Sequence, residues 1–215
     1  MIVKVCGVRT AEIAEAAIAA GADWLGLVLV AASPRHADDA AARTVVDAVH
    51  GRADLVGVMV DATTAECDEA AQRYRLSAVQ LHGAVAKATA AQASVPVIRA
   101  INVGQGAPVY TDPWWADCTI LLDAAPDLDG LPGGTGSRVD EGVAMALARH
   151  RRIILAGGLS ADNVAGAIAA VRPYGVDASS GLESAPGVKD AARVVAFVEA
   201  ARSAAELPAA ARARP

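Results

Sequence analysis

The chain has few aromatic residues and no long uninterrupted apolar run. Aromatic residues make up only 3% of its 215 residues, although hydrophobic residues make up 54%, so the apolar content comes mainly from Ala, Val, Leu and Ile. No apolar run reaches the roughly 18 residues that a membrane-spanning helix needs. This composition is typical of helices packed on a parallel sheet, and it predicts no association with a membrane.

Cysteine is also scarce. The three cysteines, at positions 6, 67 and 118, are odd in number and lack metal-ligand spacing, which argues against a disulfide framework and a cysteine-based metal site. No secretory apolar segment precedes the first polar residues, so we expect a cytoplasmic protein. The formal net charge is -5 and the 19 Lys and Arg residues are scattered, which makes nucleic acid an unexpected partner.

Short aliphatic runs alternate along the chain with Ala-rich segments of helical period, which predicts repeated βα units. Eight such units in about 200 residues favour a single-domain (β/α)8 TIM barrel over an open doubly wound sheet, which usually has fewer strands. We expect the barrel to occupy residues 1–205 and residues 206–215 to form a frayed tail. The expected strands are Ile2–Val5, Trp24–Val30, Leu55–Val60, Ala78–Leu81, Val95–Ile101, Thr119–Leu122, Ile153–Ala156 and Val176–Ala178.

The helices are expected to begin near residues that suit helix capping. Between the fifth and sixth strands, residues 102–117 contain two glycines and two prolines, so we expect a loop with at most a short helix there. The expected helix starts are near Thr10, Asp38, Thr64, Ala84, Asp140, Ser160 and Asp190.

Two polar side chains at strand ends are candidates for proton transfer. Active sites of this architecture lie at the carboxyl ends of the strands, where Cys6 follows the first strand and Asp123 the sixth. Burial of Asp123 among aliphatic residues would raise its pKa and make it a general acid. Cys6 could instead pack as a small apolar side chain, and Asp123 could form a turn. Their shared position favours a pair that exchanges protons with one substrate.

Three glycine-rich turns follow the sixth, seventh and eighth strands. Loops after the last two strands commonly hold phosphate in this fold, because their backbone N–H groups and a helix dipole favour an anion. Although glycines also serve ordinary turns, three such turns at adjacent strand ends indicate a phosphate site and hence a sugar phosphate. The expected phosphate-binding residues are Gly134, Thr135, Gly136, Gly157, Gly158, Ser179, Ser180 and Gly181.

Four further residues are expected to bind substrate. The guanidinium fork of Arg35 could hold a carboxylate by two parallel hydrogen bonds, although a solvated loop arginine is the alternative. Gln80 and His82 lie near the end of the fourth strand and could face the pocket, or His82 could satisfy a local backbone group. Asp177 is in the eighth strand, where an unpartnered carboxylate is costly to bury.

Seven motifs together resemble the phosphoribosylanthranilate isomerase family, over residues 2 to about 202. The resemblance implies that Cys6 is the general base, Asp123 the general acid, Arg35 the partner of the anthranilate carboxylate, and the late glycine turns the phosphate site. It further implies an Amadori rearrangement in tryptophan biosynthesis that needs no metal or organic cofactor, by a monomer or homodimer. The motifs are Lys4-Val5-Cys6-Gly7, Ser33-Pro34-Arg35, Gln80-Leu81-His82-Gly83, Leu121-Leu122-Asp123, Gly133-Gly134-Thr135-Gly136, Leu155-Ala156-Gly157-Gly158-Leu159 and Asp177-Ala178-Ser179-Ser180-Gly181-Leu182-Glu183.

Two other readings fit part of this pattern. Another sugar-phosphate isomerase or epimerase on the same fold would share the phosphate turns without needing Arg35, and a related isomerase that also serves histidine synthesis would carry an aspartate where Cys6 stands. A noncatalytic barrel would bind a product analogue without turnover. The thiol, together with Asp123, argues against both.

Overall fold

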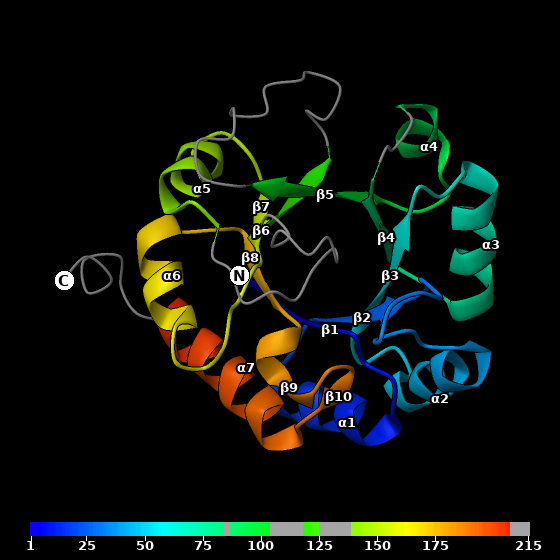
Figure 1. Cartoon of the computed structure of the whole chain (residues 1–215), viewed down its shortest axis with the longest axis horizontal. Helices are drawn as coiled ribbons and strands as arrows, with labels where there is room; N and C mark the ends of the chain where they lie inside the picture. Colours follow the sequence, from blue (N-terminus) through cyan, green and yellow to red (C-terminus); the bar gives the residue numbers. More distant parts are fainter. Residues whose placement is uncertain (84–86, 104–117, 125–138, 207–215) are drawn as a thin grey trace.

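The computed structural model describes residues 1–83, 87–103, 118–124 and 139–206. Eight parallel strands close into a barrel in the order β1 to β8, and the helices surround it (Figure 1). The TIM barrel predicted from the sequence is therefore confirmed. The strands are β1 Ile2–Cys6, β2 Trp24–Val28, β3 Asp54–Val60, β4 Ala78–His82, β5 Val97–Val103, β6 Thr119–Ala124, β7 Ile153–Leu155 and β8 Gly175–Ala178.

The helices whose expected starts lie within the described residues begin where the sequence places capping residues, with one exception. Thr10, Asp38 and Asp140 each accept a hydrogen bond from a backbone N–H of the first turn, and Thr63 forms a capping box with Glu66. Residues 84–86 and 104–117 lie outside the described residues, as does the tail beyond Glu206. The helices are α1 Ala11–Ala20, α2 Asp39–Val49, α3 Thr64–Tyr74, α4 Lys87–Gln92, α5 Glu141–Ala148, α6 Val164–Val171 and α7 Ala191–Glu206.

The exception is α6, which the sequence predicts from near Ser160 and which begins at Val164. The side chain of Asn163 explains the late start. Its Oδ1 accepts a hydrogen bond from the N–H of Ser160 at 2.9 Å, and its Nδ2 donates to the carbonyl of Gly158 at 2.8 Å. The Asn163 side chain thus forms its hydrogen bonds with the loop after β7, and these bonds hold residues 160–163 as a turn.

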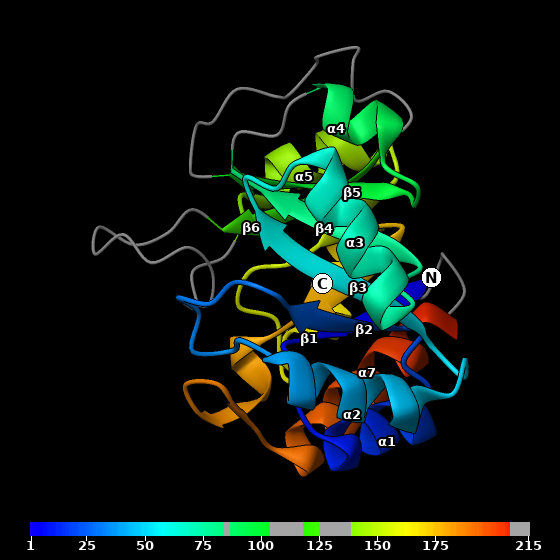
Figure 2. The same cartoon turned by 90° about the vertical axis from the view of Figure 1, so that its right-hand side faces the viewer.

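A small antiparallel hairpin between β8 and α7 was not predicted. It consists of β9 Glu183–Ala185 and β10 Val188–Lys189, and it follows a 3-10 helix at Ser180–Leu182. Figure 2 shows this hairpin in orange on the side of the barrel toward which the strand arrows point. The hairpin therefore lies at the carboxyl ends of the strands, beside the loops that form the site.

Two apolar layers result from the alternation of side chains along the strands. Val3 and Val5 face outward and pack with the helices in the main core, as do Ile120 and Leu122. Leu121 packs with six other residues in a separate cluster inside the barrel. Since successive side chains point to opposite faces, Asp123 lies on the same inward face as Leu121. None of the helices in the described part of the chain is long and apolar enough to cross a membrane.

The hairpin is attached to the loop after β2 by a close backbone contact at Gly187. This residue has φ +78°, and a Cβ built there would lie 2.1 Å from the carbonyl oxygen of Pro34. Gly187→Ala is therefore expected to lower the free energy of unfolding by more than about 1 kcal/mol, because a side chain is both strained and obstructed there. Denaturant unfolding measures the change.

The matched control is Gly166→Ala in α6. A Cβ at Gly166 meets no heavy atom within 4 Å. This change is expected to raise stability by up to about 1 kcal/mol, since alanine favours a helix over glycine. Equal effects at the two positions would contradict the attachment of the hairpin through Gly187.

Candidate active site

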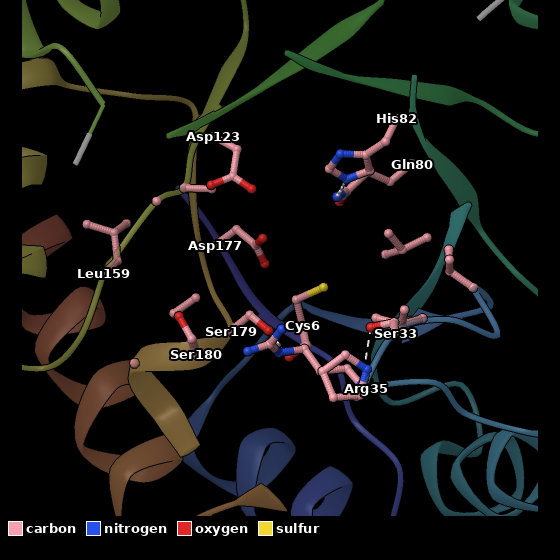
Figure 3. A pocket seen from close by; sticks show the side chains of 18 of the residues that line it. Cys6, Ser33, Arg35, Gln80, His82, Asp123, Leu159, Asp177, Ser179 and Ser180 are labelled. Atoms are coloured by element: carbon pink, nitrogen blue, oxygen red, sulfur yellow. Dashed lines mark hydrogen bonds between the residues drawn. The ribbon is translucent and has the colours of Figure 1, made fainter. Parts of the chain in front are cut away.

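A cavity of about 230 Å³ opens at the carboxyl ends of the barrel strands. Side chains from several strands and from the loops that follow them surround this space (Figure 3). It brings together every predicted site residue in the described part of the chain. Gly134, Thr135 and Gly136 lie outside the described residues. The predicted residues that line the cavity are Cys6, Arg35, Gln80, His82, Asp123, Gly157, Gly158, Asp177, Ser179, Ser180 and Gly181.

Cys6 is the last residue of β1, and its thiol points into the cavity (Figure 3). The residue is 6% exposed. Its register partner on β2 is Gly26, where a Cβ would lie 2.8 Å from the Cys6 Sγ atom. The absence of a side chain at Gly26 thus leaves room for the thiol. Burial raises the pKa of Cys6, and the nearby Lys4 ammonium opposes this effect.

Asp123 faces the same space from β6 (Figure 3). Burial, as the sequence predicts, together with the negative charge of Asp177 raises its pKa to about 6. One carboxylate oxygen accepts a hydrogen bond from the N–H of Ala124 at 2.9 Å, which acts in the opposite direction. A carboxyl group with this pKa holds a proton over part of the range near neutrality and can donate it to a bound molecule.

The Arg35 side chain already binds a carboxylate of the protein, which the sequence does not indicate. Its Nε and Nη2 atoms donate to the two carboxylate oxygens of Glu183 at 2.7 and 2.8 Å. Glu183 also accepts hydrogen bonds from Lys189 Nζ at 2.6 Å and from the Gly187 N–H at 3.2 Å. The Nη1 atom of Arg35 donates to no other described residue, so one edge of the guanidinium is left for a ligand.

His82 and Gln80 form a pair on β4. The Nε2 atoms of the two side chains lie 2.9 Å apart, which makes the amide the donor and a neutral imidazole the acceptor. Burial, together with the positive charges of Lys4 and Arg99, lowers the pKa of His82 to about 4. The Oε1 atom of Gln80 is buried and has no hydrogen-bond partner among the described residues. The pair therefore offers the cavity neutral polar groups.

Asp177 has a buried partner that the sequence analysis missed. The Nζ atom of Lys4 lies 3.0 Å from Asp177 Oδ1, and Lys4 is fully buried. A lysine in an otherwise aliphatic strand was the available signal, since a charge is rarely buried without a partner. Glu183 and Lys189 were also missed as members of the site. Their roles depend on the hairpin, which no pattern in the sequence indicated.

The glycine turns after β7 and β8 lie against each other. Gly157 and Gly158 both have positive φ, +81° and +62°, and their N–H groups donate to no other described residue. A Cβ at Gly181 would lie 2.2 Å from the carbonyl oxygen of Leu159, so only glycine permits this contact. Free backbone N–H groups beside a second glycine turn suit an anion. The described residues contain no cluster of three or more His, Cys, Asp or Glu side chains suited to a metal ion.

The chain is similar to known proteins over nearly its whole length. A family model described as N-(5'-phosphoribosyl)anthranilate (PRA) isomerase matches residues 3–200. An N-(5'-phosphoribosyl)anthranilate isomerase of Rhodopseudomonas palustris is 40% identical over 214 residues, which cover 96% of this chain and 98% of that protein.

Solved structures agree with this similarity. The phosphoribosyl anthranilate isomerase of Thermus thermophilus has a TM-score of 0.81 and 35% identity, over 94% of this chain and 99% of that one. A phosphoribosyl anthranilate isomerase in complex with reduced 1-(o-carboxyphenylamino)-1-deoxyribulose 5-phosphate has a TM-score of 0.78 and 30% identity, over 94% and 100%. The chain therefore belongs to the N-(5'-phosphoribosyl)anthranilate isomerase family.

Proposed function

We propose that this chain isomerises N-(5'-phosphoribosyl)anthranilate to 1-(o-carboxyphenylamino)-1-deoxyribulose 5-phosphate in tryptophan biosynthesis, with Cys6 as the base and Asp123 as the acid. The activity is that of its family. The observation that carries the two roles is their placement: a thiol on β1 and a carboxyl group on β6, with a pKa raised to about 6, line one cavity.

The reaction needs two proton transfers, at the ring oxygen and at the carbon on the other side of the anomeric carbon. Asp123 protonates the ring oxygen, and the furanose opens to a Schiff base whose positive nitrogen acidifies the proton on the adjacent carbon. The Cys6 thiolate removes that proton, and the resulting enolamine tautomerises to the ketone. These steps redistribute hydrogen within one molecule, so they use no metal or organic cofactor. The enzyme is therefore an intramolecular oxidoreductase that converts an aldose into a ketose.

The two ends of the substrate are expected to bind different loops. Arg35 would receive the anthranilate carboxylate on its free edge, because Glu183 already occupies Nε and Nη2. The phosphate would bind the turns at Gly157–Gly158 and Ser179–Gly181, which offer backbone N–H groups, and also Gly134, Thr135 and Gly136. Gln80, His82 and Asp177 line the intervening cavity and would contact the ribose.

The setting of the reaction follows from the same family. We propose a cytoplasmic enzyme in which residues 1–205 form one catalytic domain and residues 206–215 a frayed tail. A monomer or a homodimer is expected, and the isomerase of Thermotoga maritima, 30% identical to this chain, is described as dimeric. Neither nucleic acid nor a membrane is proposed as a partner.

One assay tests the proposed reaction directly. Purified protein is mixed with phosphoribosylanthranilate, whose fluorescence is expected to disappear, and the product is confirmed by coupling to the next enzyme of the pathway. Fluorescence loss without a product that the coupling enzyme accepts would favour another reaction. Binding of the reduced product analogue without turnover would favour a noncatalytic barrel.

Arg35→Ala is expected to raise KM by about ten- to a hundredfold, the usual effect of losing hydrogen bonds to a charged group, with a smaller change in kcat. The reason is that a carboxylate remote from the reacting carbons is held equally in the ground state and the transition state. Steady-state kinetics measure the changes in KM and kcat separately. Arg43→Ala, which alters an exposed arginine on α2, is the control and should leave both constants unchanged. An unchanged KM for Arg35→Ala would sink the carboxylate role.

Cys6→Ser and Asp123→Asn are each expected to lower kcat by a factor of about 10² to 10⁴, the usual contribution of a general acid or base. Each change removes a proton-transfer group with little change of volume, so binding of the reduced product analogue should persist. Turnover and analogue affinity are the two measurements. Near wild-type turnover in Cys6→Ser would show that the thiol only packs in the cavity.

The pH dependence of kcat/KM follows from the pKa shifts of Asp123 and Cys6. Burial raises the pKa of Asp123 to about 6 and raises that of Cys6 above its usual value. The reactive form has a protonated Asp123 and an ionised Cys6, so the pair holds one proton. We expect kcat/KM to rise as the pH increases through about 6, where a second proton leaves, and to fall at alkaline pH, where the last one leaves.

Asp123→Asn should abolish the rise near pH 6. The substrate phosphate titrates in the same range, with a pKa of about 6, and it is unchanged in this variant. A rise that persists in Asp123→Asn would therefore belong to the substrate and would contradict the assignment to Asp123.

A further inference from the structure

Lys4 is a fully buried lysine that does not reach the cavity wall. It lies on β1 two residues before Cys6, so the two side chains share the inward face of the strand. Its Nζ atom lies 3.0 Å from the Oδ1 atom of Asp177, its register partner on β8. Asp177 and Cys6 both line the cavity, whereas Lys4 lies beneath them. A substrate in the cavity would meet the carboxylate and the thiol but not the ammonium group.

Burying such a pair brings little stability by itself. The desolvation of two charges commonly exceeds their attraction, and replacement of a buried ion pair by uncharged residues is often neutral or stabilising. The benefit of Lys4 and Asp177 is therefore to be sought in the charge that they place among the groups that react.

The two charges of the Lys4–Asp177 ion pair lie toward different reacting groups. Lys4 shares β1 with Cys6, while Asp177 stands on β8, which is separated from Asp123 on β6 by β7 alone. Figure 3 shows the Asp177 side chain between those of Cys6 and Asp123. The positive end of the pair thus lies toward the thiol and the negative end toward the carboxyl group.

The other charged groups around the cavity do not cancel the effect of this ion pair on Cys6 and Asp123. His82 on β4 is neutral, with its pKa lowered to about 4, and Arg99 on β5 donates to the carbonyl of Leu81. On the opposite side, the single carboxylate of Glu183 contacts both Arg35 and Lys189. Lys189 also favours an ionised Cys6, although less strongly than Lys4 does.

We propose that the buried Lys4–Asp177 ion pair decides where the one proton shared by Cys6 and Asp123 resides. Its ammonium end favours the Cys6 thiolate, and its carboxylate end keeps the proton on Asp123. Lys4 and Asp177 are thus positioning residues, Lys4 without touching the substrate. The inference rests on the proposed roles of Cys6 and Asp123, and it explains how a pair with one proton reaches its reactive form.

The shifts in pKa agree in direction with this arrangement. After burial, which raises the pKa of Cys6, the largest influence on it is the lowering by Lys4, and Asp177 follows with the opposite sign. For Asp123 the order is reversed, because Asp177 is the largest influence after burial and raises the pKa, whereas Lys4 lowers it less. Although burial disfavours its charge, Asp177 and Cys6 raise the pKa of Lys4 and keep it protonated. The ion pair therefore brings the pKa values of the base and the acid closer together.

The test uses a variant that removes both charges with little change of volume, Lys4→Met combined with Asp177→Asn. Lys4→Met alone would leave Asp177 buried without a partner and could fail to fold, whereas loss of the whole pair is tolerated more readily. Denaturant unfolding verifies that the paired variant is folded. The matched control, Arg52→Met with Glu15→Gln, removes an exposed ion pair remote from the cavity.

The first readout is alkylation of Cys6 by iodoacetamide across a pH series, followed on the Cys6 peptide by mass spectrometry. Only the thiolate reacts, so the rate at neutral pH should fall about tenfold in the paired variant, because the loss of the Lys4 ammonium outweighs the loss of the opposing Asp177 carboxylate. The second readout is kcat/KM. Its plateau should fall by a similar factor or more, and its alkaline limb should move to higher pH, while the control variant matches the unaltered chain in both.

The outcomes separate the inference from the proposed function. A folded paired variant with an unmoved alkylation curve overturns the inference, even if turnover is lost, because the pair would then act on the substrate or the fold. Loss of turnover with an unmoved alkaline limb overturns it as well. Failure of the unaltered chain to isomerise phosphoribosylanthranilate would sink the proposed function instead, and the alkylation curves would still show whether the ion pair acts on Cys6.

Discussion

Pairing of the first strand with the last is the constraint on which the site depends. β1 and β8 run side by side from Ile2–Gly175 to Val5–Ala178, and this contact closes the barrel. Gly175 permits it, since a Cβ there would lie 2.9 Å from the Cβ of Ile2. Closure brings together residues that are 173 positions apart: the Lys4 side chain meets Asp177, and the Ser179 hydroxyl donates to the carbonyl of Cys6 at 3.2 Å. The proposed base and a turn proposed to bind phosphate are thereby held together by the pairing of β1 with β8.

Much of this arrangement could be predicted from the sequence because it follows from local patterns. Short aliphatic runs specify the strands, and capping residues such as Thr10 and Asp140 specify the helix starts. Strand direction then places Cys6 and Asp123 at the same end of the barrel, with no need to know any contact. The raised pKa of Asp123 was likewise predictable, because the aliphatic residues before it indicate burial.

What could not be predicted depends on contacts between distant segments. The fork of Arg35 was expected to be free for a substrate, yet Glu183 occupies one edge of it, and only the fold of the β9–β10 hairpin brings that carboxylate within reach. Lys4 lay within a quoted motif, but its partner emerged from strand register rather than from spacing. The late start of α6 has a similar origin, since the hydrogen bonds of Asn163 to the loop after β7 compete with the helix.

The occupied edge of Arg35 has a consequence for the resting pocket. A guanidinium already matched to a carboxylate on Nε and Nη2 keeps its plane and its direction when the pocket is empty. The side-chain entropy of Arg35 is therefore lost during folding rather than on binding, so the entropy cost of binding a ligand is smaller. The same pairing offsets the positive charge of the pocket, which weakens the attraction for small inorganic anions. Under the proposed carboxylate role of Arg35, selectivity between a planar organic acid and the salts of the surrounding solution would depend on a hairpin that takes no part in the chemistry.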